Sequence, residues 1–361
     1  MRPLIDGHLD LAWNGASHDR ELTLELAELN AAEEGMTDVG YRGKATVTFP
    51  EMRRGGIYLC LATFLARSGP KLQRKPSYLR TDVDYNTRIG SYAAAHAQWA
   101  CYEYWQEIGE IRVLRSGAEL EDHLRNQSAG AGQRQPIGVI LSMEGADPIT
   151  RPEQLDHWYN LGLRAIGPAH YGFSHYAGGT AVDGPLTSEG KELLKRMELL
   201  NMAMDVTHLC DRSMAEALDL FGGTVWASHH NCRALVPADR QLTDEQIKQL
   251  IARDAVIAAA ADAWMLRPNW IIGKTLPGDL KITSIADHID RVCQFAGNAK
   301  HSAIGSDLDG GFGTEQTPSD LKSIADLQQL DAILQSRGYS SDDIEDIFHR
   351  NWLRMFRRVL R

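Results

Sequence analysis

Eight short apolar segments, separated by stretches with helical periodicity, constrain the fold of this chain most. Because most of them are almost continuously apolar, they are typical of strands in a parallel sheet that is covered on both faces. Eight such strands with helices between them favour an α/β fold of the (β/α)8 barrel type, and a doubly wound open sheet is the alternative. The segments are Pro3–Ile5, Gly56–Phe64, Ile137–Ser142, Leu163–Gly167, Met202–Thr207, Thr224–Ser228, Ala255–Ala260 and Ser302–Gly305.

The stretches between these strands carry helix signals of their own. Thr243 and Gln246 stand just before an apolar stripe, which is the pattern of a capping box at a helix N-terminus. Thr317 followed by Pro318 predicts a second helix start, because threonine caps well and proline suits the first helical position. Residues 351–361 form a basic amphipathic stretch, which predicts either the last barrel helix or a helix that binds a membrane surface or a partner.

The length of 361 residues permits two domains at about 150 residues each, but one barrel with insertions also reaches this size. No linker rich in proline, glycine or serine divides the chain. We therefore expect a single (β/α)8 domain over residues 1–361, with loop insertions near 67–84 and 126–136. The first insertion leaves the end of the second strand, so it is either a solvated loop or a lid or subunit contact.

Charge and cysteine content bear on the partners and the compartment. Acidic residues outnumber basic ones by 48 to 38, which disfavours nucleic acid and anionic membranes as partners. Five scattered cysteines without a CxxC pair fit a reducing compartment. The longest apolar stretch is far shorter than the roughly 20 residues of a membrane helix, and no signal-peptide pattern precedes His8. We expect a cytoplasmic protein with no membrane partner.

Residues that bind metals or transfer protons stand at the ends of most of these strands. In a barrel, such ends meet at one mouth, where active sites lie. Side chains two apart on a strand share a side, so His8 and Asp10 could hold one cation together. A lone histidine near a strand end is usually a hydrogen-bonded core residue, but a shared cation would satisfy the whole set at once. The set is His8, Asp10, Glu144, His170, His208, His229, His230 and Asp307.

Three histidines with two carboxylates exceed the three protein ligands of a single catalytic zinc ion. They suit two metal ions with a carboxylate between them, a centre that can generate hydroxide near neutral pH and polarise a carbonyl group. The mixed nitrogen and oxygen donors suit Zn²⁺, and also Mn²⁺, Co²⁺ or Fe²⁺.

Five sequence motifs occur in the order found in one known family. They are DGHLDLAWN, ILSMEGADPI, DVTHLCDRSM, WASHHNCRAL and AIGSDLDGG. Together they resemble the membrane dipeptidase family (renal dipeptidase, peptidase family M19) of the amidohydrolase superfamily, from residue 6 to about residue 356. The resemblance implies a (β/α)8 barrel with two zinc ions per chain.

The resemblance also implies roles for individual residues. His8 and Asp10 match the ligands of the first zinc ion, and Glu144 matches the carboxylate that bridges both ions. His208 and His229 match the ligands of the second ion.

Three further positions match residues that act on the substrate. Asp307 matches the acid and base, His170 matches a histidine that contacts the substrate and its developing oxyanion, and Arg240 matches an arginine that contacts the substrate. His230 replaces a small residue of the family and is expected beside the centre or at the surface. The text around His170 lacks the family's usual threonines, which bears on the substrate range.

The function that follows is hydrolysis of dipeptides, L,L and also L,D, by a hydroxide between two zinc ions. One alternative is an amidohydrolase on another small amide, such as an N-acyl amino acid or a cyclic amide or lactone. The other is a barrel that binds metals without catalysis. The resemblance further implies a homodimer whose only other partner is the small dipeptide substrate.

Overall fold

The structure is a computed structural model that describes residues 1–70, 82–129 and 135–361. The centres of both expected insertions, residues 71–81 and 130–134, lie outside the described residues. At the base of the first insertion, the Arg67 guanidinium pairs with the Asp84 carboxylate, with 2.8 Å between Nε and Oδ1.

Each of the eight expected apolar segments overlaps a strand, and the bounds differ by a few residues. A ninth strand, three residues long, was not expected because so short a segment carries no periodicity; it pairs with the start of the strand that ends at Glu144. The strands are β1 (Leu4–Leu9), β2 (Ile57–Leu65), β3 (Ile111–Val113), β4 (Ile137–Glu144), β5 (Leu163–Gly167), β6 (Ala203–Asp205), β7 (Val225–Trp226), β8 (Ile257–Ala259) and β9 (Ser302–Ile304).

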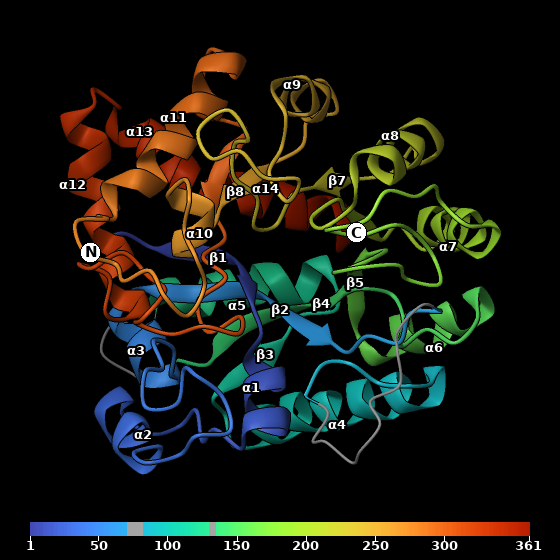
Figure 1. Cartoon of the computed structure of the whole chain (residues 1–361), viewed down its shortest axis with the longest axis horizontal. Helices are drawn as coiled ribbons and strands as arrows, with labels where there is room; N and C mark the ends of the chain where they lie inside the picture. Colours follow the sequence, from blue (N-terminus) through green and yellow to red (C-terminus); the bar gives the residue numbers. More distant parts are fainter. Residues whose placement is uncertain (71–81, 130–134) are drawn as a thin grey trace.

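Helices follow most strands and cover the outside of the sheet (Figure 1). They are α1 (Leu11–His18), α2 (Leu26–Ala32), α3 (Phe49–Arg54), α4 (Arg88–Glu107), α5 (Gly117–Ala129), α6 (Leu155–Leu161), α7 (Ser188–Leu199), α8 (Asp211–Leu220), α9 (Asp244–Ala252), α10 (Ala263–Leu266), α11 (Thr283–Ala296), α12 (Gln329–Ser336), α13 (Ser341–Glu345) and α14 (Asn351–Val359). None of these described helices is both long and apolar enough to cross a membrane.

Two predicted helix starts had different outcomes. Thr243 and Gln246 form the expected capping box of α9. The start predicted at Thr317 is wrong, because the Thr317 hydroxyl donates to the Leu321 carbonyl and the backbone continues as a turn. The helical segment there begins later, at Ile324, where Ser323 provides the capping box.

The parallel strands curl into a barrel. β1, β2, β4, β5, β6 and β7 are hydrogen-bonded in that order, and β8 pairs with β9. A bridge between Ala227 and Ile257 joins the end of β7 to β8. Between β9 and β1 the Asp6 carboxylate replaces a ladder, because its Oδ1 accepts the backbone N–H groups of both His8 and Ser306, at 3.0 and 2.9 Å. This closure confirms the (β/α)8 barrel and excludes the open sheet.

The helix α14 fills the N-terminal end of the barrel. Trp352, Met355 and Phe356 are buried in one apolar cluster with residues from the barrel strands, such as Ile5 and Trp226. Trp352 Nε1 donates to the Ile304 carbonyl oxygen at 3.0 Å, and its ring stacks on Phe356. The basic amphipathic stretch is therefore the last barrel helix, since its apolar stripe is already covered.

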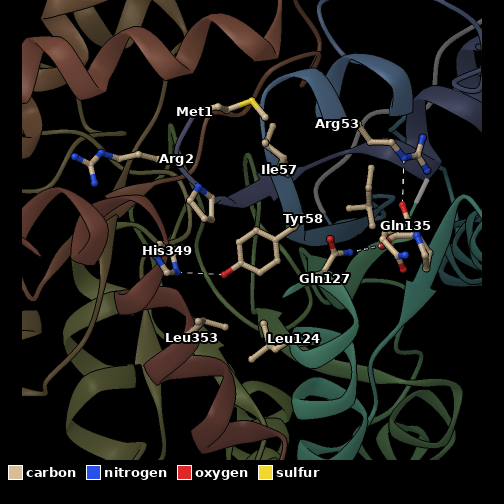
Figure 2. A pocket seen from close by; sticks show the side chains of 14 residues that line it. Met1, Arg2, Arg53, Ile57, Tyr58, Leu124, Gln127, Gln135, His349 and Leu353 are labelled. Atoms are coloured by element: carbon tan, nitrogen blue, oxygen red, sulfur yellow. Dashed lines mark hydrogen bonds between the residues drawn. The ribbon is translucent and has the colours of Figure 1, made fainter. Parts of the chain in front are cut away.

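A cavity of about 630 Å³ opens at the same end, lined in part by residues 1–3, which precede β1, and by the first residues of β2 and β4 (Figure 2). On its wall the Tyr58 hydroxyl lies 3.3 Å from His349 Nδ1. This cavity lies at the opposite end of the strands from the metal-binding residue types.

Candidate metal centre

The predicted metal-ligand residues lie at the C-terminal ends of different strands. His8 belongs to β1 with Asp10 just beyond it, and Glu144 is the last residue of β4. His208 and His229 each follow a short strand, β6 and β7, by three residues. Because the strands are parallel, their C-terminal ends lie at the same end of the barrel. Residues that are far apart in the sequence therefore meet there.

Glu144 lies at the middle of this set. Its Oε1 is 3.5 Å from His8 Nε2, 3.1 Å from His208 Nε2 and 3.2 Å from His229 Nε2. The Nε2 atoms of His208 and His229 are themselves 3.1 Å apart. On the other side, His8 Nε2 lies 3.8 Å from Asp10 Oδ1. The structure therefore brings all five predicted ligands together around one carboxylate.

The donor atoms fall into overlapping groups that could each hold a cation. Two groups, each with atoms within 4.8 Å of one another, share Glu144: one with His8 and His229, the other with His170 and His208. A third contains His8, Asp10 and Asp307. His8 Nε2 is buried and has no hydrogen-bond partner among the described residues. A buried nitrogen left in this way, among several converging donors, fits a divalent cation.

Hydroxyl groups orient the rings and one carboxylate. Thr180 Oγ1 is 3.0 Å from His208 Nδ1, and Ser228 Oγ is 2.8 Å from His229 Nδ1. The Thr63 hydroxyl donates to Asp10 Oδ1. Such outer contacts fix ring orientation and tautomer in metal sites.

The backbone at two of these positions is strained. His208 has a φ of +68° and Asp307 a φ of +60°, in the left-handed region that non-glycine residues avoid. Each costs about 1–3 kcal/mol and persists only where the surrounding structure imposes it, which occurs most often at functional sites.

Burial and charge set the protonation of the centre. Burial lowers the pKa of His208 and of His229 well below the ordinary histidine value, so both imidazoles are neutral and can donate a lone pair. Burial also disfavours the charged form of His8, but the Glu144 and Asp10 carboxylates outweigh it and raise the pKa of His8 well above its usual value. A cation bound there would displace this proton.

A small cavity of about 90 Å³ adjoins the ligands and is lined by Asp307, His170 and Arg240. Burial raises the pKa of the Asp307 carboxyl well above its ordinary value, and Asp307 Oδ1 lies 3.9 Å from His8 Nε2. Arg240 is buried and donates from Nη2 to the His229 carbonyl oxygen at 2.8 Å. Its Nη1 has no hydrogen-bond partner among the described residues, so the guanidinium has a free donor.

Sequence reasoning missed two titratable residues of this cavity. Asp262 lies two residues after the seventh apolar segment, close behind it as the predicted ligands are behind theirs, and burial raises its pKa to about 7. Tyr171 also lines the cavity but carried no sequence signal beyond its place beside His170. His230 is buried, donates its backbone N–H to the Ala258 carbonyl at 2.7 Å and belongs to none of the described candidate metal groups.

A (β/α)8 barrel with histidine, aspartate and glutamate donors gathered at the C-terminal ends of its strands defines a metal-dependent hydrolase. The model of the membrane dipeptidase family (peptidase family M19) matches residues 1–361. The chain therefore belongs to this family of metallo-dipeptidases.

The chain is also similar to individual proteins. The chain is 27% identical to a protein from the pqqA 5′ region of Klebsiella pneumoniae, over 70% of this chain and 90% of that protein. It is 26% identical to an uncharacterized dipeptidase of Schizosaccharomyces pombe, over 67% of this chain but only 56% of the relative. A metallopeptidase from Rhodobacter sphaeroides, crystallised with a phosphinate mimic of L-Ala-D-Ala, superposes with a TM-score of 0.75, 21% identity and 99% coverage of both chains. This last likeness shows the shared fold.

Proposed function

We propose that the chain hydrolyses dipeptides at a centre of two Zn²⁺ ions, with Glu144 between them. When bound, the ions supply a hydroxide nucleophile and polarise the scissile carbonyl group. His8 and Asp10 would hold one ion, and His208 and His229 the other. The observation that carries this proposal is the convergence of three imidazole nitrogens on Glu144 Oε1, at 3.1–3.5 Å. Mn²⁺, Co²⁺ or Fe²⁺ would suit the same donors.

The residues of the adjoining cavity complete the proposed reaction. Arg240, with its unpartnered Nη1, would bind the terminal carboxylate of the dipeptide, which favours short substrates. His170 would donate to the developing oxyanion. Asp307, whose carboxyl has a raised pKa, would take the proton of the nucleophile and pass it to the leaving amine.

We extend the substrate range to dipeptides with a D-residue at the C-terminal position. The support is the Rhodobacter sphaeroides relative, whose structure contains a mimic of L-Ala-D-Ala. The expected homodimer and cytoplasmic location stay predictions, and light scattering on the purified protein would test the first.

The decisive experiment combines metal analysis of the purified protein with a substrate panel. The panel contains L,L and L,D dipeptides, N-acyl amino acids and a cyclic amide and lactone. We expect two metal ions per chain and hydrolysis of dipeptides, both lost in Glu144→Gln. Hydrolysis of the other substrates but of no dipeptide would contradict the proposed function and indicate another kind of amidohydrolase. Bound metal without any hydrolysis would indicate a non-catalytic barrel.

A further inference from the structure

Arg67 stands two residues beyond β2, and among the described residues its guanidinium contacts the Asp84 carboxylate, the His170 ring and the face of the Tyr171 ring. Toward the outside it forms a two-pronged ion pair with Asp84, with Nε to Oδ1 at 2.8 Å and Nη2 to Oδ2 at 2.9 Å. The backbone holds the pair in register, because Arg67 N–H donates to the Val83 carbonyl and Tyr85 N–H donates to the Arg67 carbonyl. Toward the inside, Arg67 Nη1 lies 3.3 Å from His170 Nδ1.

In the contact between Arg67 and His170, only the guanidinium can donate the hydrogen bond. A guanidinium group has five N–H donors and no acceptor, and it stays protonated in proteins. His170 Nδ1 must therefore accept, with its lone pair directed at Arg67. A nitrogen that accepts a hydrogen bond carries no proton, so the ring is neutral. The single proton of a neutral ring then sits on Nε2, the atom 3.8 Å from Glu144 Oε1.

His208, on the neighbouring strand end, has the opposite arrangement. Its Nδ1 lies 3.0 Å from Thr180 Oγ1, and the same hydroxyl also donates to the His208 carbonyl oxygen at 3.3 Å. Because the hydroxyl proton is used there, the hydroxyl oxygen accepts from Nδ1–H of His208. The Nε2 of His208 therefore presents a lone pair toward Glu144, as a metal ligand requires.

We propose that Arg67 is a positioning residue that holds His170 as the Nε2–H tautomer, so that His170 is a hydrogen-bond donor to the substrate and not a metal ligand. This inference rests on the proposed function for its catalytic consequence. His170 and His208, which both lie close to Glu144, thereby differ in tautomer. The Arg67 guanidinium leaves the proton of His170 on Nε2, and the Thr180 hydroxyl leaves the proton of His208 on Nδ1. The positive charge behind the ring also strengthens Nε2–H as a donor to a developing negative charge.

The kinetic test replaces Arg67 by methionine, which keeps an unbranched apolar stem but removes the charge and the donors. We expect kcat for a dipeptide to fall about 10- to 100-fold with little change in KM, because one oxyanion donor is worth about 100- to 1000-fold and Arg67 acts through it. Arg67→Lys retains a charged donor and should lie between Arg67→Met and the wild type.

Arg88→Met is the matched control. Arg88 also pairs with a carboxylate, Glu189, at 2.8 Å and lies over a tyrosine ring, but its Nη1 donates to the Thr150 backbone carbonyl instead of a histidine. We expect wild-type kcat for it. A kcat of Arg67→Met within twofold of the wild type would overturn the proposal.

A second test does not depend on activity. In zinc-loaded protein labelled with ¹⁵N-histidine, with His170→Asn used for assignment, we expect the unprotonated nitrogen resonance of His170 at Nδ1. A proton on Nδ1 would overturn the proposal, even if Arg67→Met failed to fold. If the wild type hydrolysed no dipeptide, the proposed function would fail, while this measurement would still decide the tautomer.

Discussion

At the scale of single residues, Asp307 combines a strained backbone with a carboxyl whose pKa is raised. Asparagine tolerates the left-handed region, so Asp307→Asn should keep the fold and the metal content. We expect kcat to fall at least about 100-fold, because the variant cannot carry the proton. Asp19→Asn is the control, since Asp19 is an exposed aspartate with a φ of +55° that follows the last residue of α1, away from the candidate centre. Steady-state kinetics with metal analysis measures both, and unchanged turnover would remove Asp307 from the reaction.

His288, buried in α11, gives a prediction about acid stability. Its Nδ1 accepts the Cys232 backbone N–H at 3.0 Å, and burial lowers its pKa to about 3. Between that value and the ordinary value near 6.5, the unfolded chain binds a proton at this site that the folded chain does not. Stability is therefore lost as the pH falls through this window, by up to about 1.4 kcal/mol per pH unit.

His288→Asn should flatten the dependence of the unfolding free energy on pH between 6.5 and 4, measured by urea titration. The exposed His157 provides the control, and His157→Asn should keep the wild-type slope. An equal slope in the His288 variant and the wild type would contradict the assignment.

At the scale of elements, β1 and α14 meet at Gly7. A Cβ atom at this position would overlap the Trp352 ring and lie 2.9 Å from the Ser228 carbonyl oxygen. The ring cannot move aside, because Phe356 stacks on it and Trp226 meets it edge-on. Glycine is therefore required here for space, between Asp6 and the metal-ligand candidate His8.

We expect Gly7→Ala to lower the unfolding free energy by about 1–3 kcal/mol, the usual cost of overpacking a core. Chemical denaturation would show this as a lower midpoint with an unchanged slope. Gly40→Ala should leave the midpoint within a few tenths of a kcal/mol, since a Cβ at Gly40 meets no atom within 4 Å. Equal midpoints for Gly7→Ala and the wild type would show that the barrel end adapts.

At the scale of the whole molecule, the sequence predicted the barrel because strand and helix periodicities are local. The gathering of the candidate ligand residues was also predictable, since the end of an apolar segment marks the mouth of a parallel barrel. What escaped prediction has three different causes. β3 is too short to carry a pattern, Ser323 in place of Thr317 starts its helix because of local hydrogen bonding, and Arg67 gains its importance only when β2 and β5 place it against His170.

The closure of the barrel predicts where the sheet opens first. β2 and β4 share seven consecutive residue pairs, whereas in the described part of the chain no ladder joins β9 to β1. Backbone amides beside this join, at His8 and Ser306, should therefore exchange with deuterium sooner than those in the middle of β4, since local opening follows the number of contacts that must break. Hydrogen exchange followed by mass spectrometry measures this. Equal protection at both places would contradict it.

The Asp6 carboxylate thus makes the hydrogen bonds that connect β1 to the segment after β9. His8 lies on the β1 side of this join and Asp307 on the β9 side. A transient separation of β1 from β9 would therefore move these two residues of the candidate centre apart while the other strands stayed hydrogen-bonded. Loss of turnover on mild heating should then precede loss of the fold.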